Sequence, residues 1–416
     1  TDSTPLVVAA STATGTLALT SSGAITQTGA LAITGNATLT GADITLNNPA
    51  NSFGGTVGFT GATVALTDST ALSLAAGTAT GNLVLNSGGA VTQSGALTVG
   101  GTTAVTATGA DITLTNAANS LAGAITFSGA NVALTNTKAT TLAASTATGT
   151  LVVTSSNAVS QTGSLTAGGN ANFTGTDITL TNAGNSFGGT VGFTGANVAL
   201  FDSTALALAA STATGTLAAT STAAITQTGA LAVTGNAAFT GTDITLTNAL
   251  NTFGGTVAFT GANVAVTDST ALSVAASSAT GTLALTSGGA LTQTGALTVG
   301  GNATLNATGN ILLTNTGNNF SGTVAFTGAN VDIQSAFNLS LAASSATGTL
   351  NLVGLNLTQT GAITTGGNTT LSAADITLSN AANSFGGTVT FTGANVALRD
   401  GTPLVVAAST ATGTLT

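Results

Sequence analysis

The chain has no histidine, cysteine, methionine, tryptophan, tyrosine or glutamate, and Lys138 and Arg399 are its only cations in 416 residues. Without cysteine, neither a disulfide framework nor a thiolate metal site can form. Without histidine, glutamate and clustered cations, the usual general acids, general bases and anion-stabilising groups of enzymes are also missing. We therefore predict that the chain is not an enzyme and that it holds no cofactor or metal.

Positive charge is too scarce for a nucleic-acid partner. Eleven aspartates against two cations give a formal net charge of −9, whereas phosphate backbones are bound by clustered Lys and Arg. The mean hydropathy of +0.51 suggests a membrane protein. However, apolar runs such as Pro5–Ala10 are far shorter than the roughly 18 residues that a spanning helix requires. We expect no nucleic acid and no transmembrane segment.

A twelve-residue block from Asn51 to Ala62 organises everything else. It returns, slightly varied and at a nearly constant interval, starting at Asn119, Asn185, Asn251, Asn318 and Asn383. A fixed period of this kind indicates a repeat architecture. The predicted repeats are 1–66, 67–134, 135–200, 201–266, 267–333 and 334–398, with a partial repeat at 399–416. No linker separates them, so the chain is predicted to be one continuous array over residues 1–416.

Short runs with a period of two fill each repeat. In Leu17-Ala18-Leu19-Thr20 and Asp43-Ile44-Thr45-Leu46, apolar residues alternate with small or polar ones, and Gly, Asn or Ser-Gly pairs separate such runs. Nothing shows a helical period. The pattern predicts an all-β fold, a right-handed parallel β-helix (β-solenoid) with about 22 residues per coil and three coils per repeat of roughly 66 residues. A transmembrane barrel is disfavoured because its aromatic girdles are missing.

The repeated block is predicted to supply core rings and a corner. Its two Phe positions are six residues apart and flank a Gly-Gly corner, and Leu121 with Phe127 is the one altered pair. The predicted core rings are Phe53, Phe59, Phe187, Phe193, Phe253, Phe259, Phe320, Phe326, Phe385 and Phe391. Asn suits a turn because it tolerates positive φ and its amide bonds unpaired backbone groups. The predicted corner residues are Asn48, Asn51, Asn116, Asn119, Asn182, Asn185, Asn248, Asn251, Asn315, Asn318, Asn380 and Asn383.

Two other patterns have a functional interpretation beside a structural one. Most aspartates recur in two columns, one in Asp-Ile-Thr-Leu and one in Thr-Asp-Ser-Thr. We expect them to be solvated at turns and strand edges, with weak metal binding as the alternative. Thr-x-Thr pairs such as Thr38/Thr40 are natural outward residues of strands, but flat arrays of them would also suit ice binding. The pairs do not recur once in every predicted coil, which disfavours ice binding.

A family resemblance rests on three recurring units. They are Gly-Ala-Asn-Val-Ala-Leu, Gly-Ala-Ile-Thr-Gln-Thr-Gly-Ala-Leu and Asn-Ser-Phe-Gly-Gly-Thr-Val. Tandem units of this style resemble the repeat shafts of filamentous-haemagglutinin-type large exoproteins, the two-partner-secreted adhesins of Gram-negative bacteria. The resemblance implies a secreted fibre on a bacterial cell surface, used for adhesion or for spacing a binding tip away from the cell. It transfers no functional residue to this chain.

The ends of the chain carry the same segment. Thr4–Leu17 is identical to Thr402–Leu415, and we expect the chain to be an interior part of a longer fibre whose export signal lies elsewhere. The predicted function is a non-enzymatic structural or adhesive surface fibre. The alternatives are a self-assembling extracellular sheath and an ice-binding solenoid. Expected partners are further repeats of the same chain, laterally associated copies, or a host receptor.

Overall fold

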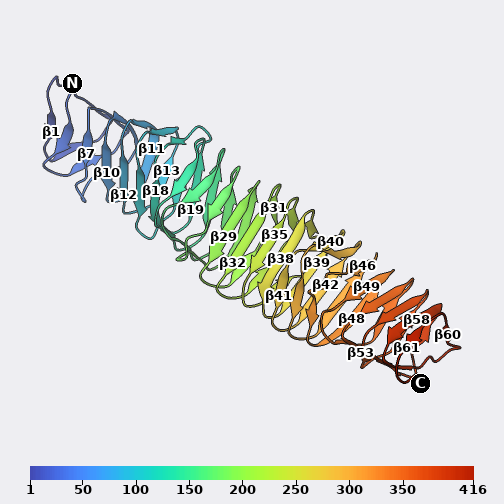
Figure 1. The fold of residues 1–416 in the computed structure, drawn as a ribbon. Coiled ribbons are helices and arrows are strands. Elements are labelled where there is room, and N and C mark those ends of the chain that lie inside the picture. Colours follow the sequence, from blue (N-terminus) through green and yellow to red (C-terminus); the bar gives the residue numbers. More distant parts are fainter. The chain divides into compact units, whose positions relative to one another are not determined.

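The computed structural model describes all 416 residues, in strands joined by turns and with no helix. No helical segment is therefore available to cross a membrane. The chain divides into two compact units, Thr1–Ala205 and Leu206–Thr416. Within each unit, neighbouring strands pair in parallel, and coil stacks on coil (Figure 1). The predicted all-β parallel solenoid is confirmed, while its right-handed winding and its continuity as one array stay predictions.

Two long sheets enclose the core of the first unit. One, here the β10 sheet, contains β1 (Leu6–Val8), β4 (Ile25–Gln27), β7 (Ile44–Leu46), β10 (Val64–Asp68), β12 (Leu83–Ser87), β15 (Thr103–Ala107), β18 (Ile125–Gly129), β20 (Thr140–Leu142), β21 (Ser145–Ala147), β23 (Val159–Gln161), β24 (Leu165–Ala167), β26 (Ile178–Leu180), β27 (Ser186–Phe187) and β29 (Val198–Asp202). The other, the β9 sheet, contains β3 (Leu17–Thr20), β6 (Ala37–Thr40), β9 (Thr56–Gly61), β11 (Leu72–Ala79), β13 (Val91–Gln93), β14 (Leu97–Val99), β16 (Ile112–Leu114), β17 (Ser120–Leu121), β19 (Val132–Asn136), β22 (Leu151–Ser155), β25 (Ala171–Thr174) and β28 (Thr190–Gly195). A third, small sheet consists of β2 (Ser11–Ala13), β5 (Leu31–Ile33) and β8 (Ser52–Phe53).

The second unit likewise contains two long sheets, without a third small one. Its β39 sheet contains β30 (Leu206–Leu208), β31 (Ser211–Ala213), β33 (Ile225–Gln227), β34 (Leu231–Val233), β36 (Ile244–Leu246), β37 (Thr252–Phe253), β39 (Val264–Asp268), β42 (Leu283–Ser287), β45 (Ala303–Ala307), β48 (Thr323–Gly328), β50 (Leu339–Leu341), β51 (Ser344–Ala346), β53 (Asn356–Gln359), β54 (Ile363–Thr365), β56 (Asp375–Leu378), β57 (Ser384–Phe385) and β59 (Asn395–Leu398). Its β38 sheet contains β32 (Leu217–Ser221), β35 (Ala237–Thr240), β38 (Thr256–Gly261), β40 (Leu272–Val274), β41 (Ser277–Ala279), β43 (Leu291–Gln293), β44 (Leu297–Val299), β46 (Ile311–Leu313), β47 (Asn319–Phe320), β49 (Val331–Gln334), β52 (Leu350–Val353), β55 (Thr369–Ser372), β58 (Thr388–Gly393), β60 (Val405–Val406) and β61 (Thr410–Ala411).

Alternation along each strand determines which side chains form the core. In β12, Leu83 and Leu85 are buried while Asn86, which follows them, is exposed, as the two-residue period of a strand requires. The two sheets pack against each other through such inward residues. Phe173 of the β9 sheet meets Phe187 of the β10 sheet edge to face, with ring centroids 5.9 Å apart. The core is therefore a narrow apolar layer between two sheets.

The coil is shorter than the sequence pattern predicts. In the first unit, seven successive pairings lead from Leu6 to Leu142. In the second unit, seven pairings lead from Leu206 to Leu341. A coil thus averages about 19 residues in both units, because many corners use only two or three residues.

The repeat therefore does not take three coils. In the first repeat, the chain runs along one or the other face of the coil seven times. Three of these crossings are bent and consist of two strands each: β1 with β2, β4 with β5, and β7 with β8. The other four are straight and consist of one strand each: β3, β6, β9 and β10. Seven is odd, so the next repeat begins on the other sheet, with its first bent strand β11 beside β9. One repeat equals three and a half coils. Equivalent residues of consecutive repeats consequently alternate between the two sheets.

Candidate functional site

Each repeat buries one asparagine amide against a glutamine of the neighbouring coil. The Nε2 of Gln27 donates to the Oδ1 of Asn51 over 2.8 Å, and the Nδ2 of Asn51 donates to the Oε1 of Gln27 over 2.9 Å. Asn51 also accepts from the backbone N of Leu31 at 2.9 Å and donates to the backbone O of Leu46 at 3.1 Å. Its side chain is fully buried, and these bonds satisfy both ends of the amide.

The same amide pair recurs in every repeat. The other pairs are Gln93 with Asn119, Gln161 with Asn185, Gln227 with Asn251, Gln293 with Asn318, and Gln359 with Asn383. These asparagines are no more than 1% exposed. The pair joins one coil to the next, so it contributes to the stacking of the solenoid.

The earlier asparagine of each block lies half exposed in the turn itself. The Oδ1 of Asn48 accepts from the backbone N of Ala50 at 2.9 Å, and Asn51 N donates to Asn48 O at 3.1 Å. The equivalent Oδ1 bonds are made by Asn116, Asn182, Asn248, Asn315 and Asn380. The expected use of positive φ does not occur, because Gly109 is the one residue with positive φ. Side-chain hydrogen bonding alone therefore accounts for asparagine here.

The paired phenylalanines lie in the core on both sides of the Gly-Gly corner. Phe53 ends β8, Phe59 lies in β9, and Gly54 with Gly55 connects these strands. All of the predicted rings are buried, with at most 3% of each side chain exposed: Phe53, Phe59, Phe187, Phe193, Phe253, Phe259, Phe320, Phe326, Phe385 and Phe391. Leu121 and Phe127 occupy the same places and are also buried. These residues are structural.

One aspartate column differs from the expectation of solvated turns. Asp68, Asp202 and Asp268 occupy inward positions at the ends of their strands and are at most 1% exposed. Asp68 accepts at Oδ1 from the backbone N and the hydroxyl of Thr70, both at 2.9 Å, and at Oδ2 from Phe53 N at 3.3 Å. The buried carboxylate therefore accepts hydrogen bonds from the donor groups of the corner, from within the core. In place of this aspartate, the third repeat has Asn136, which donates to Leu121 O and Thr140 Oγ1.

The first member of that column in the chain is more accessible. Asp2 accepts from the backbone N of Thr4 at 3.0 Å and from its hydroxyl at 2.8 Å. The hydrogen bond from the Thr4 side chain, followed by that from its backbone, holds the pKa of Asp2 below its ordinary value.

The second aspartate column forms an exposed ladder at a corner. Asp111 Oδ1 accepts from both the backbone N and the Nδ2 of Asn131 at 3.0 Å. Asn131 Oδ1 in turn accepts from the backbone N of Thr150 at 2.9 Å. Equivalent ladders begin at Asp177, Asp243 and Asp375. Nowhere do three His, Cys, Asp or Glu side chains gather as a metal site would require.

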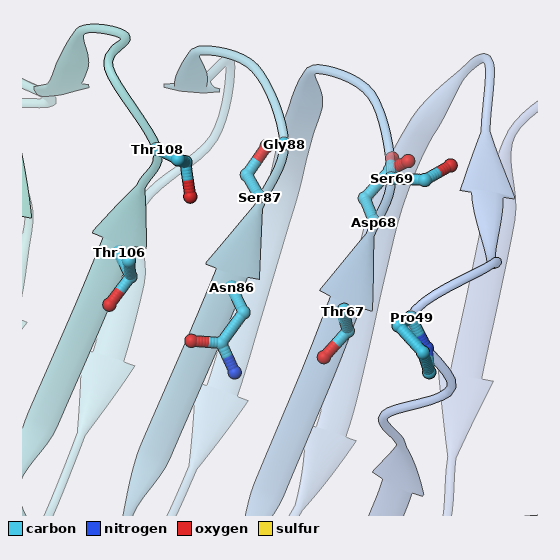
Figure 2. Close-up of a pocket in the computed structure, with 9 residues that line it drawn as sticks. All are labelled: Pro49, Thr67, Asp68, Ser69, Asn86, Ser87, Gly88, Thr106 and Thr108. Atoms are coloured by element: carbon cyan, nitrogen blue, oxygen red, sulfur yellow. The ribbon is translucent and has the colours of Figure 1, made fainter.

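A polar groove of about 370 Å³ lies on the first unit. Figure 2 shows its floor: Thr67 of β10, Asn86 of β12 and Thr106 of β15 follow one another in a row on neighbouring strands. Pro49 closes one end, and Ser69, Ser87 and Thr108 border it where the strands end. The groove offers hydroxyls and amides in a periodic row, but it has no nucleophile paired with a base.

That row is the beginning of a longer column. Pairing continues it across seven coils, through Thr67, Asn86, Thr106, Ser128, Thr146, Thr166 and Ser186. The β9 sheet carries a similar column of Thr20, Thr40, Thr60, Thr78, Thr98 and Ser120. The Thr-x-Thr pairs themselves do not recur at every rung, since Ala65, Val84 and Ala104 form the column two positions earlier on these strands. With the observed coil, a polar side chain recurs at every rung.

Comparison with protein families agrees with this repeat structure. The family model described as "Repeats of unknown function (DUF5649)" matches six consecutive segments, at residues 1–60, 61–128, 129–194, 195–260, 261–327 and 328–392. The chain belongs to this repeat family. No curated protein and no solved structure matches it. The DUF5649 boundaries fall slightly before the repeat boundaries predicted from the sequence, and both describe the same period.

Glutamine is the partner that the sequence interpretation missed. Six of the seven glutamines of the chain occupy the same place in their repeats, which was an available signal. Gln27 and Asn51 are 24 residues apart, and they meet only because one coil stacks on the next.

Proposed function

We propose that the chain is a non-enzymatic spacer in a secreted surface fibre of a bacterium, where it holds an adhesive or binding tip at a distance from the cell. The chain is a tandem-repeat β-solenoid, and this architecture fits a structural repeat protein. The resemblance of its repeats to the shafts of filamentous-haemagglutinin-type exoproteins supports the surface location.

The proposal rests on one observation: the recurring polar side chains form hydrogen bonds between coils. In each repeat, the buried Gln-Asn amide pair bonds one coil to the next instead of facing a ligand. The exposed Asp111-Asn131 ladder does the same at a corner. Hydrogen bonds between coils that recur in each repeat stabilise a solenoid along its whole length, because its stability is roughly the sum of contributions from adjacent coils.

Location is tested with antibodies raised against the purified chain. Immunogold labelling of intact cells of the source organism is expected on fibrous material outside the cell, and extracts are expected to show the segment within a larger polypeptide. Label confined to the cell interior would overturn the surface role. A matched sample of permeabilised cells controls for access of the antibody.

Ice binding is a second candidate, and the hydroxyl columns favour it. On the β38 sheet, Thr220, Thr240 and Thr260 pair rung by rung, which places their side chains roughly 4.8 Å apart along the stack. A regular, uncharged hydroxyl row suits an ordered water lattice. The chain is then expected to slow ice growth, and Thr240→Lys with Thr260→Lys is expected to abolish the effect. Equal ice growth with and without the chain would exclude this function.

A further inference from the structure

Both faces of the second unit carry two adjacent columns of different height. On the outer side of the β38 sheet, Ala218, Ala238 and Ala258 pair as one column, and Thr220, Thr240 and Thr260 pair as the next. Alanine projects a single methyl group, whereas threonine branches at Cβ. The face therefore consists of a threonine ridge beside an alanine groove, about 7 Å apart because two residues of a strand separate them.

The β39 sheet repeats this relief on the other side of the core. Its low column is Ala265, Ala284 and Ala325, interrupted by the taller Thr304 between Ala284 and Ala325, and its high column is Thr267, Thr286, Asn306 and Thr327. Consecutive repeats place their low and high columns on opposite sheets, because one repeat takes three and a half coils. Both faces of the stack therefore carry this relief.

Charge does not oppose contact at the rungs that carry this relief, although Asp332 of β49 lies at an outward position farther along the β38 sheet. The ridge and groove columns contain only Ala, Thr and Asn, although the chain carries a formal charge of −9. Asp268, at the end of β39, is 1% exposed and points inward. Asp243 lies at a corner, bonded to Asn263. An uncharged, flat face of small residues permits close approach of a second sheet.

We propose that these faces pack against a second copy of the same chain, threonine ridge into alanine groove. A two-fold axis parallel to the stack carries each ridge onto the groove beside it, so the face is complementary to itself. The partner must also have the same spacing between coils, because only then does each strand of one solenoid lie opposite a strand of the other. Two copies aligned in parallel have equal coil spacing and place each ridge opposite a groove. A two-fold axis across the stack would set ridge against ridge.

The size of the contact determines its strength. The Thr267 column continues through Ser345, Thr364 and Ser384, for seven coils in all. The strands are five or six residues long only at the first four rungs, β39, β42, β45 and β48. Four rungs by one five-residue strand measure roughly 15 by 15 Å, so each partner loses roughly 225 Å² of surface, about a quarter of a standard stable interface. One face alone therefore binds weakly. Since each copy has two such faces, association continues into layers as the concentration rises.

Analytical ultracentrifugation of the full chain over a wide concentration range tests the packing. The chain is expected to associate reversibly, and Ala238→Leu with Ala258→Leu, which fills the groove of the β38 face, is expected to weaken association roughly tenfold or more. Adding Ala265→Leu and Ala284→Leu on the β39 face should leave the monomer. Ala249→Leu, at an exposed turn, is the matched control and should change nothing.

Two outcomes overturn the proposal. A wild-type chain that stays monomeric at every concentration has no such interface. Groove-filling variants that associate more strongly than wild type would show that contact depends on apolar area and not on the ridge and groove. Circular dichroism of each variant verifies that it folds. The packing concerns the chain itself and holds whether or not the chain is carried on a cell surface, so failure of the immunolabelling experiment leaves it unaffected.

Parallel alignment is tested by disulfide cross-linking of single-cysteine variants, since the chain has no cysteine of its own that could form other disulfides. Thr240→Cys on one copy should oppose Ala238→Cys on another, because ridge faces groove. A mixture of the two single-cysteine variants is therefore expected to form disulfide-linked dimers under mild oxidation, in excess of either variant alone. Faster cross-linking of Thr240→Cys with itself would show ridge against ridge and would contradict the parallel two-fold arrangement.

Discussion

Replacing the buried amide of one repeat by leucine should destabilise the coils around it by several kcal/mol. Asn119 accepts from Leu97 N at 2.9 Å and donates to Leu114 O at 3.1 Å. It also exchanges two hydrogen bonds of 2.8 Å with Gln93. In Asn119→Leu the backbone groups of Leu97 and Leu114 stay buried without these partners. Each such group costs about 1–3 kcal/mol, so the variant should lose about 2–6 kcal/mol.

Native-state hydrogen exchange is the suitable assay, because a long repeat array need not unfold in one step. The amide of Leu97 should exchange much faster in Asn119→Leu, and amides several coils away should keep their protection. Asn172→Leu is the control, since Asn172 is exposed on β25 and its replacement should stay within about 0.5 kcal/mol. Unchanged protection of Leu97 in Asn119→Leu would refute the stabilising role of the amide pair.

Three further predictions concern single positions in the first unit. Phe127→Ala removes a ring that is 1% exposed and should lower the opening free energy of the surrounding core amides by about 3–5 kcal/mol in native-state hydrogen exchange. A loss below about 1 kcal/mol would mean that the core is loosely packed. Gly109 has a φ of 64° and open space around it, so Gly109→Ala should lower stability by about 1–2 kcal/mol from backbone strain alone. Gly15 also lies in open space but has no positive φ, so the control Gly15→Ala should leave stability unchanged. Equal effects of the two substitutions would contradict the left-handed turn. Asp2 has a lowered pKa, so its stabilising contribution is present above the unfolded-state pKa and is lost as the pH falls through the folded-state pKa. Thr4→Val, which removes the hydroxyl donor, should raise the pKa of Asp2 in an NMR titration, and an unchanged pKa would show that the hydroxyl is not the cause.

The period-two pattern and the repeat were sufficient to predict the fold class. Alternation in runs such as Leu17-Ala18-Leu19-Thr20 specifies strands, and a repeat without helices or linkers favours stacking of coils. The two Phe positions of the block could be assigned to the core because large aromatic residues beside a Gly-Gly corner have no other apolar surroundings. The turn asparagines could be assigned because their amides replace backbone partners at corners.

Coil length was harder to predict, since one repeat divides into three coils as readily as into three and a half. The choice depends on how few residues a corner needs, and corners such as Gly54-Gly55 are short. The buried state of Asp68 was missed for a related reason. Its neighbours Thr70 and Phe53 supply the hydrogen bonds that make burial of a carboxylate possible, and Phe53 belongs to the preceding coil.

The half-coil offset between consecutive repeats is tested most directly by electron paramagnetic resonance distances between pairs of spin labels. Thr60 of β9 and Ser128 of β18 are equivalent residues of the first two repeats, and they lie on opposite sheets. Thr60 and Ser120 lie on the same sheet, three pairings apart, at roughly 14 Å. Labels at Thr60 and Ser128 should be clearly farther apart, beyond roughly 20 Å. If Thr60 and Ser128 instead gave the shorter distance of the two pairs, the repeat of three and a half coils would be contradicted.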